Sequence, residues 1–178
     1  DRRRRGLELG QATAQPGRGY DLAVQMVQDA RAAAAAANKV LSEGETEELR
    51  TALGAGGTGK GAAGALRGSA GALKELADAQ KRRETRMVRD SVDLSLTDLA
   101  TFYRDALVQA TGARVQPVHV DARRVTASMG RKFSPEALLR CIDAVMAARV
   151  EIGQNVKPEV AVGGMVARIS MALAASLR

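Results

Sequence analysis

The stretch from Ala72 to Thr111 contains neither glycine nor proline over 40 residues. Such a run predicts helix, and a single helix of this length would extend about 60 Å at 1.5 Å per residue. Apolar residues recur at helical spacing toward both ends of the run, whereas Gln80–Asp90 is almost entirely polar. The run fits one long helix or two helices that meet in the polar section, and oppositely charged pairs such as Arg86 and Asp90 favour continuity.

Helix signals continue through most of the remaining sequence. Ser134-Pro135-Glu136 combines a capping hydroxyl, a proline at the first helical position and an acid in the first turn, which together mark a helix start. The segment with strand-like alternation, Gly112–Val120, contains Pro117 and therefore predicts an extended loop. Further helices are expected at Tyr20–Leu41 (ended by Gly44), Glu45–Leu53, Asp121–Met129, Ser134–Ile152 and from Pro158 onward. The predicted fold class is all-α, a helical bundle with one long or broken central helix.

Helical spacing on the last two helices predicts their buried faces. The residues expected on these faces are Leu138, Leu139, Ile142, Val145 and Met146 in the first, and Val162, Met165, Val166, Ile169, Leu173 and Leu177 in the second. Cys141 lies beside the first face and is expected to be a small buried hydrophobe.

Residues 1–19 carry glycines and a proline without a sustained period, which predicts an arm or linker at the end of a preceding domain. Residues 20–178 are then expected to form one helical C-terminal domain. Because the chain begins at Asp1 without a methionine and continues with Arg2–Arg5, we expect it to be a fragment of a larger protein.

Charge and cysteine content narrow the class of protein. The chain has 27 Lys+Arg against 20 Asp+Glu, a net charge of +7, and one cysteine. A single thiol forms neither an internal disulfide nor a cysteine zinc cluster, which favours an intracellular protein. No apolar stretch approaches the roughly 18 residues of a membrane span, so a soluble protein is expected.

Two features invite a chemical interpretation. Gly54–Gly61 matches the G-x-x-x-x-G-K pattern of a phosphate loop, but Gly61 replaces the Ser or Thr that binds magnesium and no strand precedes it, so a connector is predicted. His119 is the only histidine, and without further ligands a structural or solvent-facing role is expected rather than a metal site. We therefore expect no catalytic residue, cofactor or metal.

Basic residues concentrate in Arg2–Arg5 and in Lys81–Arg89. Such patches bind phosphates in some proteins, which keeps a basic helical nucleic-acid-binding module as the alternative function. Interleaved aromatic residues that would stack on bases are absent, so a solvated or partner-facing helix surface is the preferred interpretation.

Several segments from Gly61 onward together resemble the C-terminal domain of the bacterial DNA polymerase III delta-prime subunit, a clamp-loader component, in its actinobacterial form. The segments that carry the resemblance are Gly68–Leu76, Gln80–Arg86, Arg89–Asp93, Asp98–Leu107, Ser134–Glu136 and Asn155–Pro158. They cover about two thirds of the chain, and residues 20–53 fit more loosely. One departure is Gly163-Gly164, near which relatives in that family usually carry an acid.

The resemblance implies a helical collar domain without ATPase activity of its own, which assembles with the delta and gamma or tau subunits in the bacterial cytoplasm at the replisome. Contact with the sliding clamp and primed DNA would be indirect, through the complex. The isolated fragment is expected to be monomeric, because a heteromeric ring joins unlike surfaces. The candidate interface residues are Leu73, Leu76, Arg82, Arg83, Arg86, Arg104 and Met165, with a core position as the alternative for the three apolar ones.

Overall fold

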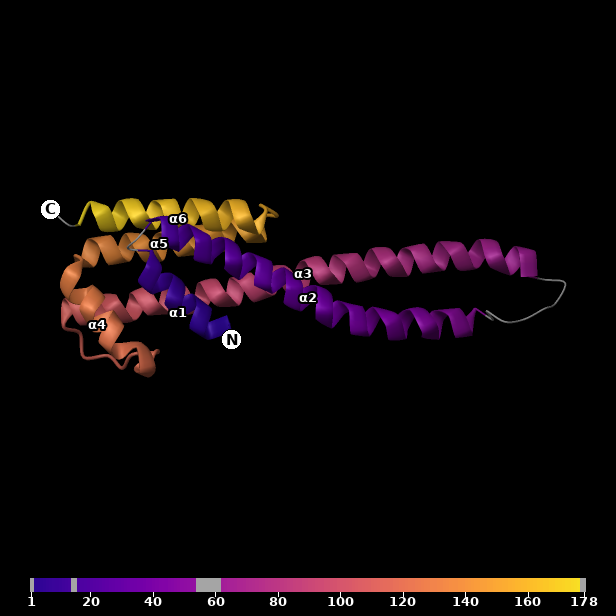
Figure 1. The fold of residues 1–178 in the computed structure, drawn as a ribbon, viewed down its shortest axis with the longest axis horizontal. Coiled ribbons are helices and arrows are strands. Elements are labelled where there is room, and N and C mark those ends of the chain that lie inside the picture. Colours follow the sequence, from indigo (N-terminus) through magenta and orange to yellow (C-terminus); the bar gives the residue numbers. More distant parts are fainter. Residues whose placement is uncertain (1, 14–15, 54–61, 177–178) are drawn as a thin grey trace. The chain divides into compact units, whose positions relative to one another are not determined.

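A computed structural model describes residues 2–13, 16–53 and 62–176 of the chain. Within these ranges every regular element is a helix and no strand occurs, which confirms the all-α prediction. The elements are α1 (Arg2–Ala12), α2 (Pro16–Ala52), α3 (Ala62–Thr111), the short 3-10 helix η1 (Val120–Ala122), α4 (Arg123–Lys132), α5 (Pro135–Gly153) and α6 (Pro158–Ala174) (Figure 1).

The helices form two compact units. The first, which we call the bundle, consists of Asp1–Asp29 and Arg89–Arg178, and the second, which we call the hairpin, consists of Ala30–Val88. Helices α2 and α3 each contribute one part to the bundle and another to the hairpin, where they run side by side (Figure 1). The sequence analysis expects a single helical domain over residues 20–178, and the division into two units is a finding of the structure.

Helix α3 is continuous through the polar section Gln80–Asp90, so one long helix forms rather than two. It ends where Gly112 adopts a φ of +68°, a conformation that favours glycine. The Ala113 amide then donates to the Val108 carbonyl oxygen at 3.2 Å, which satisfies one carbonyl group of the last turn. On the bundle part of α3 the expected apolar stripe is buried at Val92, Leu96, Leu99, Phe102, Tyr103 and Ala106, whereas Leu107, also expected on the stripe, is only half-buried.

Helix α1 occupies most of the segment for which an arm or linker was expected. Leu9 is 1% exposed, and a Cβ atom added to Gly10 would lie 2.5 Å from the Phe102 ring of α3. Gly6 lies one turn earlier and also approaches α3 closely. Gly6 and Gly10, two of the glycines that indicated a loop, are therefore packing positions, because a missing side chain lets two helices come close together.

Helices α5 and α6 complete the bundle core. Helix α5 begins at the expected cap, where Ser134 Oγ accepts a hydrogen bond from the Ala137 amide. Two residues predicted to be buried are not: Leu139 is 51% exposed and Met146 is 43% exposed. The buried face of α5 is centred on Cys141 and neighbouring apolar residues, and at 100° per residue both exposed side chains lie on the opposite face.

Helix α2 is longer than expected. It continues through Gly44 to Ala52, so the predicted break at Gly44 and the separate helix Glu45–Leu53 are wrong. No atom lies within 4 Å of the place that a Gly44 Cβ would occupy, so this glycine is an ordinary exposed helical residue. The glycine-rich segment Gly54–Gly61, with its phosphate-loop pattern, lies outside the described residues.

Helix α4 approaches α3 most closely at Gly130. A Cβ atom at this position would lie 2.6 Å from the Ala106 carbonyl oxygen and 2.9 Å from the Ala110 amide nitrogen. Both are backbone atoms, which move only if the helix itself moves. The crossing of these two helices therefore requires glycine.

We expect Gly130→Ala to lower the free energy of unfolding by about 1–3 kcal/mol, because a backbone shift is needed to admit the methyl group. Gly153→Ala is the matched control, since the last residue of α5 has open space at the Cβ position. We expect this control to change the free energy by less than about 0.5 kcal/mol. Chemical denaturation followed by circular dichroism measures both variants, and equal effects would contradict the packing argument.

Candidate partner-binding face

The candidate interface residues from the sequence analysis divide between the two units. Leu73, Leu76, Arg82, Arg83 and Arg86 belong to the hairpin, whereas Arg104 and Met165 belong to the bundle. Met165 is 0% exposed and lies in the bundle core, so it is not available as a surface anchor. Leu73 and Leu76 are half-buried in the hairpin, and Arg82 and Arg86 are exposed.

Arg83 joins the two helices of the hairpin. Its guanidinium group forms a two-pronged contact with the Glu45 carboxylate, in which Nη2 donates to Oε2 at 3.0 Å and Nη1 donates to Oε1. The Nε atom donates to Asn38 Oδ1 at 2.9 Å, and Gln80 Nε2 donates to Glu45 Oε2 at 3.1 Å. These hydrogen bonds, first those from Arg83 and then those from Gln80, lower the pKa of Glu45. Arg83 therefore has an internal role.

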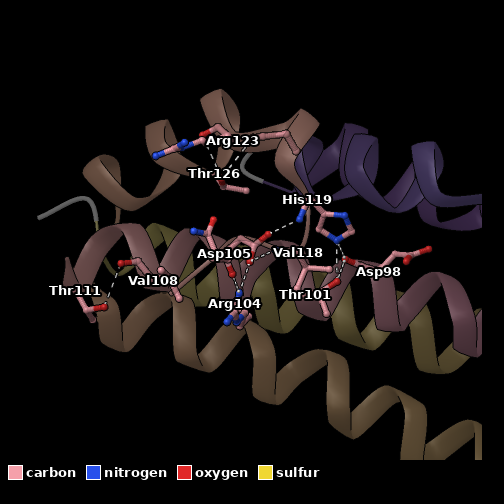
Figure 2. Close-up of polar contacts among 12 residues, drawn as sticks. Asp98, Thr101, Arg104, Asp105, Val108, Thr111, Val118, His119, Arg123 and Thr126 are labelled. Carbon is pink, nitrogen blue, oxygen red and sulfur yellow. Dashed lines mark hydrogen bonds and ion pairs between the residues drawn. The ribbon is translucent and has the colours of Figure 1, made fainter. Parts of the chain in front are cut away.

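Arg104 also forms its hydrogen bonds within the chain (Figure 2). Its Nη1 atom donates to the Asp105 carboxylate at 2.7 Å and to the Gln116 carbonyl oxygen at 3.0 Å. The fully buried Asp105 carboxylate accepts the amide hydrogens of Val118 at 3.0 Å and His119 at 2.8 Å. Asp105 thus anchors the loop that leads from α3 to η1, because it satisfies backbone donors in a buried place.

His119 is 2% exposed, and its position is structural. Its Nε2 atom lies 2.8 Å from Thr101 Oγ1 and 3.2 Å from the Asp98 carbonyl oxygen, both on α3 (Figure 2). Because a carbonyl oxygen only accepts hydrogen bonds, this geometry assigns a proton to Nε2. The imidazole therefore fastens the loop to α3 beside Asp105.

The buried thiol and phenol of the core are unsuited to acid-base or nucleophilic chemistry. Burial raises the pKa of the Cys141 thiol to about 12, which keeps it protonated at neutral pH. Burial also raises the pKa of Tyr103, whose hydroxyl group makes a short hydrogen bond with Thr13. Both groups act as packing residues, as expected for Cys141.

Helix α6 carries an exposed row without charge. The outward positions Val160, Gly164, Ala167, Met171 and Ala174 recur at helical spacing, and none of the five is charged, although the exposed Arg168 lies beside them with its Nη2 atom 3.9 Å from the place of a Gly164 Cβ. Val160 is 64% exposed and Met171 is 72% exposed. We call this the α6 row. The preceding glycine, Gly163, faces Tyr20 of α2, where an added Cβ would lie 3.3 Å from the ring.

Helix α5 extends the apolar surface beside the α6 row. Its exposed face carries Leu139, Met146 and Val150. A groove of about 550 Å³ lies between the two helices, lined by Arg140, Asp143, Ala144, Ala147, Arg168, Met171, Ala172 and Ala175. The alanines leave room between the helices, and the rim holds charges of both signs. Such a groove has the character of a docking site for large apolar side chains rather than of a site for a reaction between polar groups.

Apolar residues occur on both faces of α5, so apolar spacing alone does not show which face is buried. Leu139 and Met146, which are predicted to be core, lie on the face opposite Cys141. The detectable signal lies on α6, whose only charged residues are Glu159 and Arg168. A helix that is apolar on its outward side has a second surface to cover.

Within the described ranges, no group of His, Cys, Asp and Glu residues could hold a metal ion. No described helix combines the length and apolarity needed to cross a membrane. Comparison of the chain with protein-family models, with curated proteins and with solved structures gives no match.

We expect Glu45→Gln to destabilise the hairpin at neutral pH, and the difference from the unsubstituted chain to close under acid conditions. A lowered carboxyl pKa stabilises the fold above its ordinary value of 4.5 and loses that contribution as the pH falls through the lowered value. Thermal unfolding followed by circular dichroism between neutral and acid pH measures this difference. Glu43→Gln, at a more exposed glutamate, is the control, and a pH-independent gap would contradict the interpretation.

We expect Asp105→Asn to lower the free energy of unfolding by about 1–3 kcal/mol, because an amide nitrogen would face a buried backbone donor. Asp143→Asn, at an exposed carboxylate of the same unit, should change it by less than about 0.5 kcal/mol. Urea denaturation measures both. A neutral Asp105→Asn would show that the loop does not depend on this carboxylate.

Proposed function

We propose that the chain is a non-catalytic protein-binding module whose bundle docks onto helical partner subunits through the outward faces of α5 and α6. The observation that carries the proposal is the α6 row, in which Val160 and Met171 are more than half exposed and Met171 lines a groove rich in alanine. Contiguous exposed apolar surface with a polar rim is typical of protein interaction sites. The charged rim residues Arg140 and Asp143 have opposite signs, which suits them to orient a partner.

The partners proposed are the delta and gamma or tau subunits of a bacterial clamp loader, in which the chain would serve as the collar domain of a delta-prime subunit. This identity rests on the resemblance of the segments between Gly68 and Pro158. In that role the chain acts in DNA replication at the replisome in the cytoplasm, has no ATPase activity of its own, and contacts the sliding clamp and primed DNA through the complex.

The proposed heteromeric role predicts the association state of the isolated chain. A standard interface buries about 800 Å² on each partner, and a ring of unlike subunits places different surfaces side by side. The isolated chain is therefore expected to be monomeric or weakly self-associating. The α6 row would be covered only when the partner is present.

We expect Met171→Lys to weaken assembly with the partner subunits about tenfold or more, because a side chain of this size contributes about 1.5–3 kcal/mol when buried. Leu94→Lys is the matched control: Leu94 is 50% exposed on α3, outside the proposed face, and its replacement should leave assembly unchanged. Co-expression with the C-terminal domains of the other subunits, followed by size-exclusion chromatography with light scattering, measures both.

Failure of the folded, unsubstituted chain to co-elute, while the other subunits assemble normally, would reject the clamp-loader proposal. Equal losses in Met171→Lys and Leu94→Lys would instead reject the assignment of the face. Circular dichroism of each purified variant distinguishes lost binding from lost folding.

A further inference from the structure

Three arginines of α4 line a second groove, on the bundle and apart from α5 and α6. Its volume is about 660 Å³, and its lining residues are Val120, Asp121, Arg123, Arg124, Ala127 and Arg131. All three arginines are exposed. The groove therefore presents three guanidinium groups against a single carboxylate.

These arginines differ from those that serve the fold. Arg83, Arg104, Arg149 and Arg168 each form an ion pair with a carboxylate of the chain. Within the described ranges, no such ion pair is formed by Arg123, Arg124 or Arg131. Helix α4 itself contains four cationic residues, the fourth being Lys132, and no acidic one. The positive charge of this helix is thus not balanced by its own side chains.

Two of the arginines lie where their positive charge is unfavourable in the unbound protein. Arg123 and Arg124 lie in the first turn of α4, where the helix dipole is positive and disfavours cations. The N-cap residue, Ala122, provides no side-chain hydrogen bond to the first turn. A bound anion would interact favourably with the guanidinium groups and with the helix dipole together.

We propose that the α4 groove binds the phosphate backbone of nucleic acid without regard to sequence. Arg124 and Arg131 lie on one side of α4, separated by about 10 Å along the axis at 1.5 Å per residue. A strand of duplex DNA presents a phosphate about every 3.4 Å along its axis, so this spacing spans about three phosphates. Arginine also matches phosphate geometry with paired donors.

Nucleic acid fits the groove better than an acidic peptide does. Tight peptide binding depends on apolar anchors that fill desolvated pockets, and the apolar lining here consists of Val120 and Ala127. Val120 is 70% exposed, so it forms no enclosed pocket. Backbone phosphates need only accessible cations, and these the groove supplies.

The α4 groove is a different site from the basic cluster Lys81–Arg89. In that cluster Arg83 is already bonded to Glu45 and Asn38, and the cluster lies mainly in the hairpin. The α4 groove is also separate from the α6 row. A negative result for nucleic-acid binding would therefore not contradict the proposed assembly function, and the reverse also holds.

The test uses the full chain and a short fluorescent DNA duplex, with binding measured by anisotropy between about 50 and 200 mM salt. We expect Arg124→Gln/Arg131→Gln to weaken binding about tenfold at low salt and to reduce the slope of log affinity against log salt by about 2. Arg124→Lys/Arg131→Lys should retain most of the slope. Asp121→Asn should strengthen binding, because it removes the carboxylate from the groove.

Arg18→Gln/Lys157→Gln is the control of equal charge change, since both residues are exposed on the bundle and neither lines the groove. Retained binding in this control supports the proposal, and equal loss in both double variants overturns it in favour of a diffuse charge effect. Absence of duplex binding at low salt also overturns it, as does preferential binding of polyglutamate. Should the Arg124→Gln/Arg131→Gln protein fail to fold, unchanged affinity in Asp121→Asn overturns the assignment of the groove.

Discussion

Four segments of the bundle meet the C-terminal part of α3, each through a contact that depends on one particular residue. Helices α1 and α4 approach closely because Gly10 and Gly130 have no side chain at the point of contact. Helix α5 is joined by Arg149, whose Nε and Nη2 atoms donate to the Asp93 carboxylate at 2.7 and 2.9 Å. The loop after α3 is held by Asp105. Because α3 carries all these contacts on one uninterrupted helix, their order along α3 sets the positions of the other elements.

The helical class, the bounds of α5, the start of α6 and most of the buried stripe of α3 were accessible from the sequence, because periodicity and capping are local signals. The role of α1 was not, since glycine marks both loops and close helix contacts and only the opposing Phe102 distinguishes them. The exposed face of α5 was also difficult to predict from the sequence. Leu139 and Met146 are apolar, and their burial depends on which side of the helix meets a neighbour. Met165, a candidate interface residue, lies in the core because its side of α6 meets the rest of the bundle.

Whether an arginine is bonded to another side chain of the protein indicates its availability to a ligand better than the local density of arginines in the sequence does. After the N-terminal run, basic residues are densest around Arg83, yet Arg83 itself forms hydrogen bonds with Asn38 and Glu45 inside the hairpin. Arg124 and Arg131 are spread over α4 and remain accessible in a groove. Apolar residues follow the same logic, because Met171 is outward and Met165 inward although only six positions separate them. The two proposals thus rest on side chains that the fold leaves accessible, namely Met171, Arg124 and Arg131.

The hairpin has few fully buried apolar side chains among its described residues, and this has a thermodynamic consequence. Among its described residues the buried apolar side chains are Ala30, Ala34 and Val88, whereas Asn38, Glu45, Gln80 and Arg83 form the hydrogen-bonded centre. The heat-capacity change on unfolding rises with the apolar surface exposed and falls with the polar surface exposed. Unfolding of the hairpin would therefore contribute little to the heat-capacity change, and the value measured by calorimetry would come chiefly from the bundle.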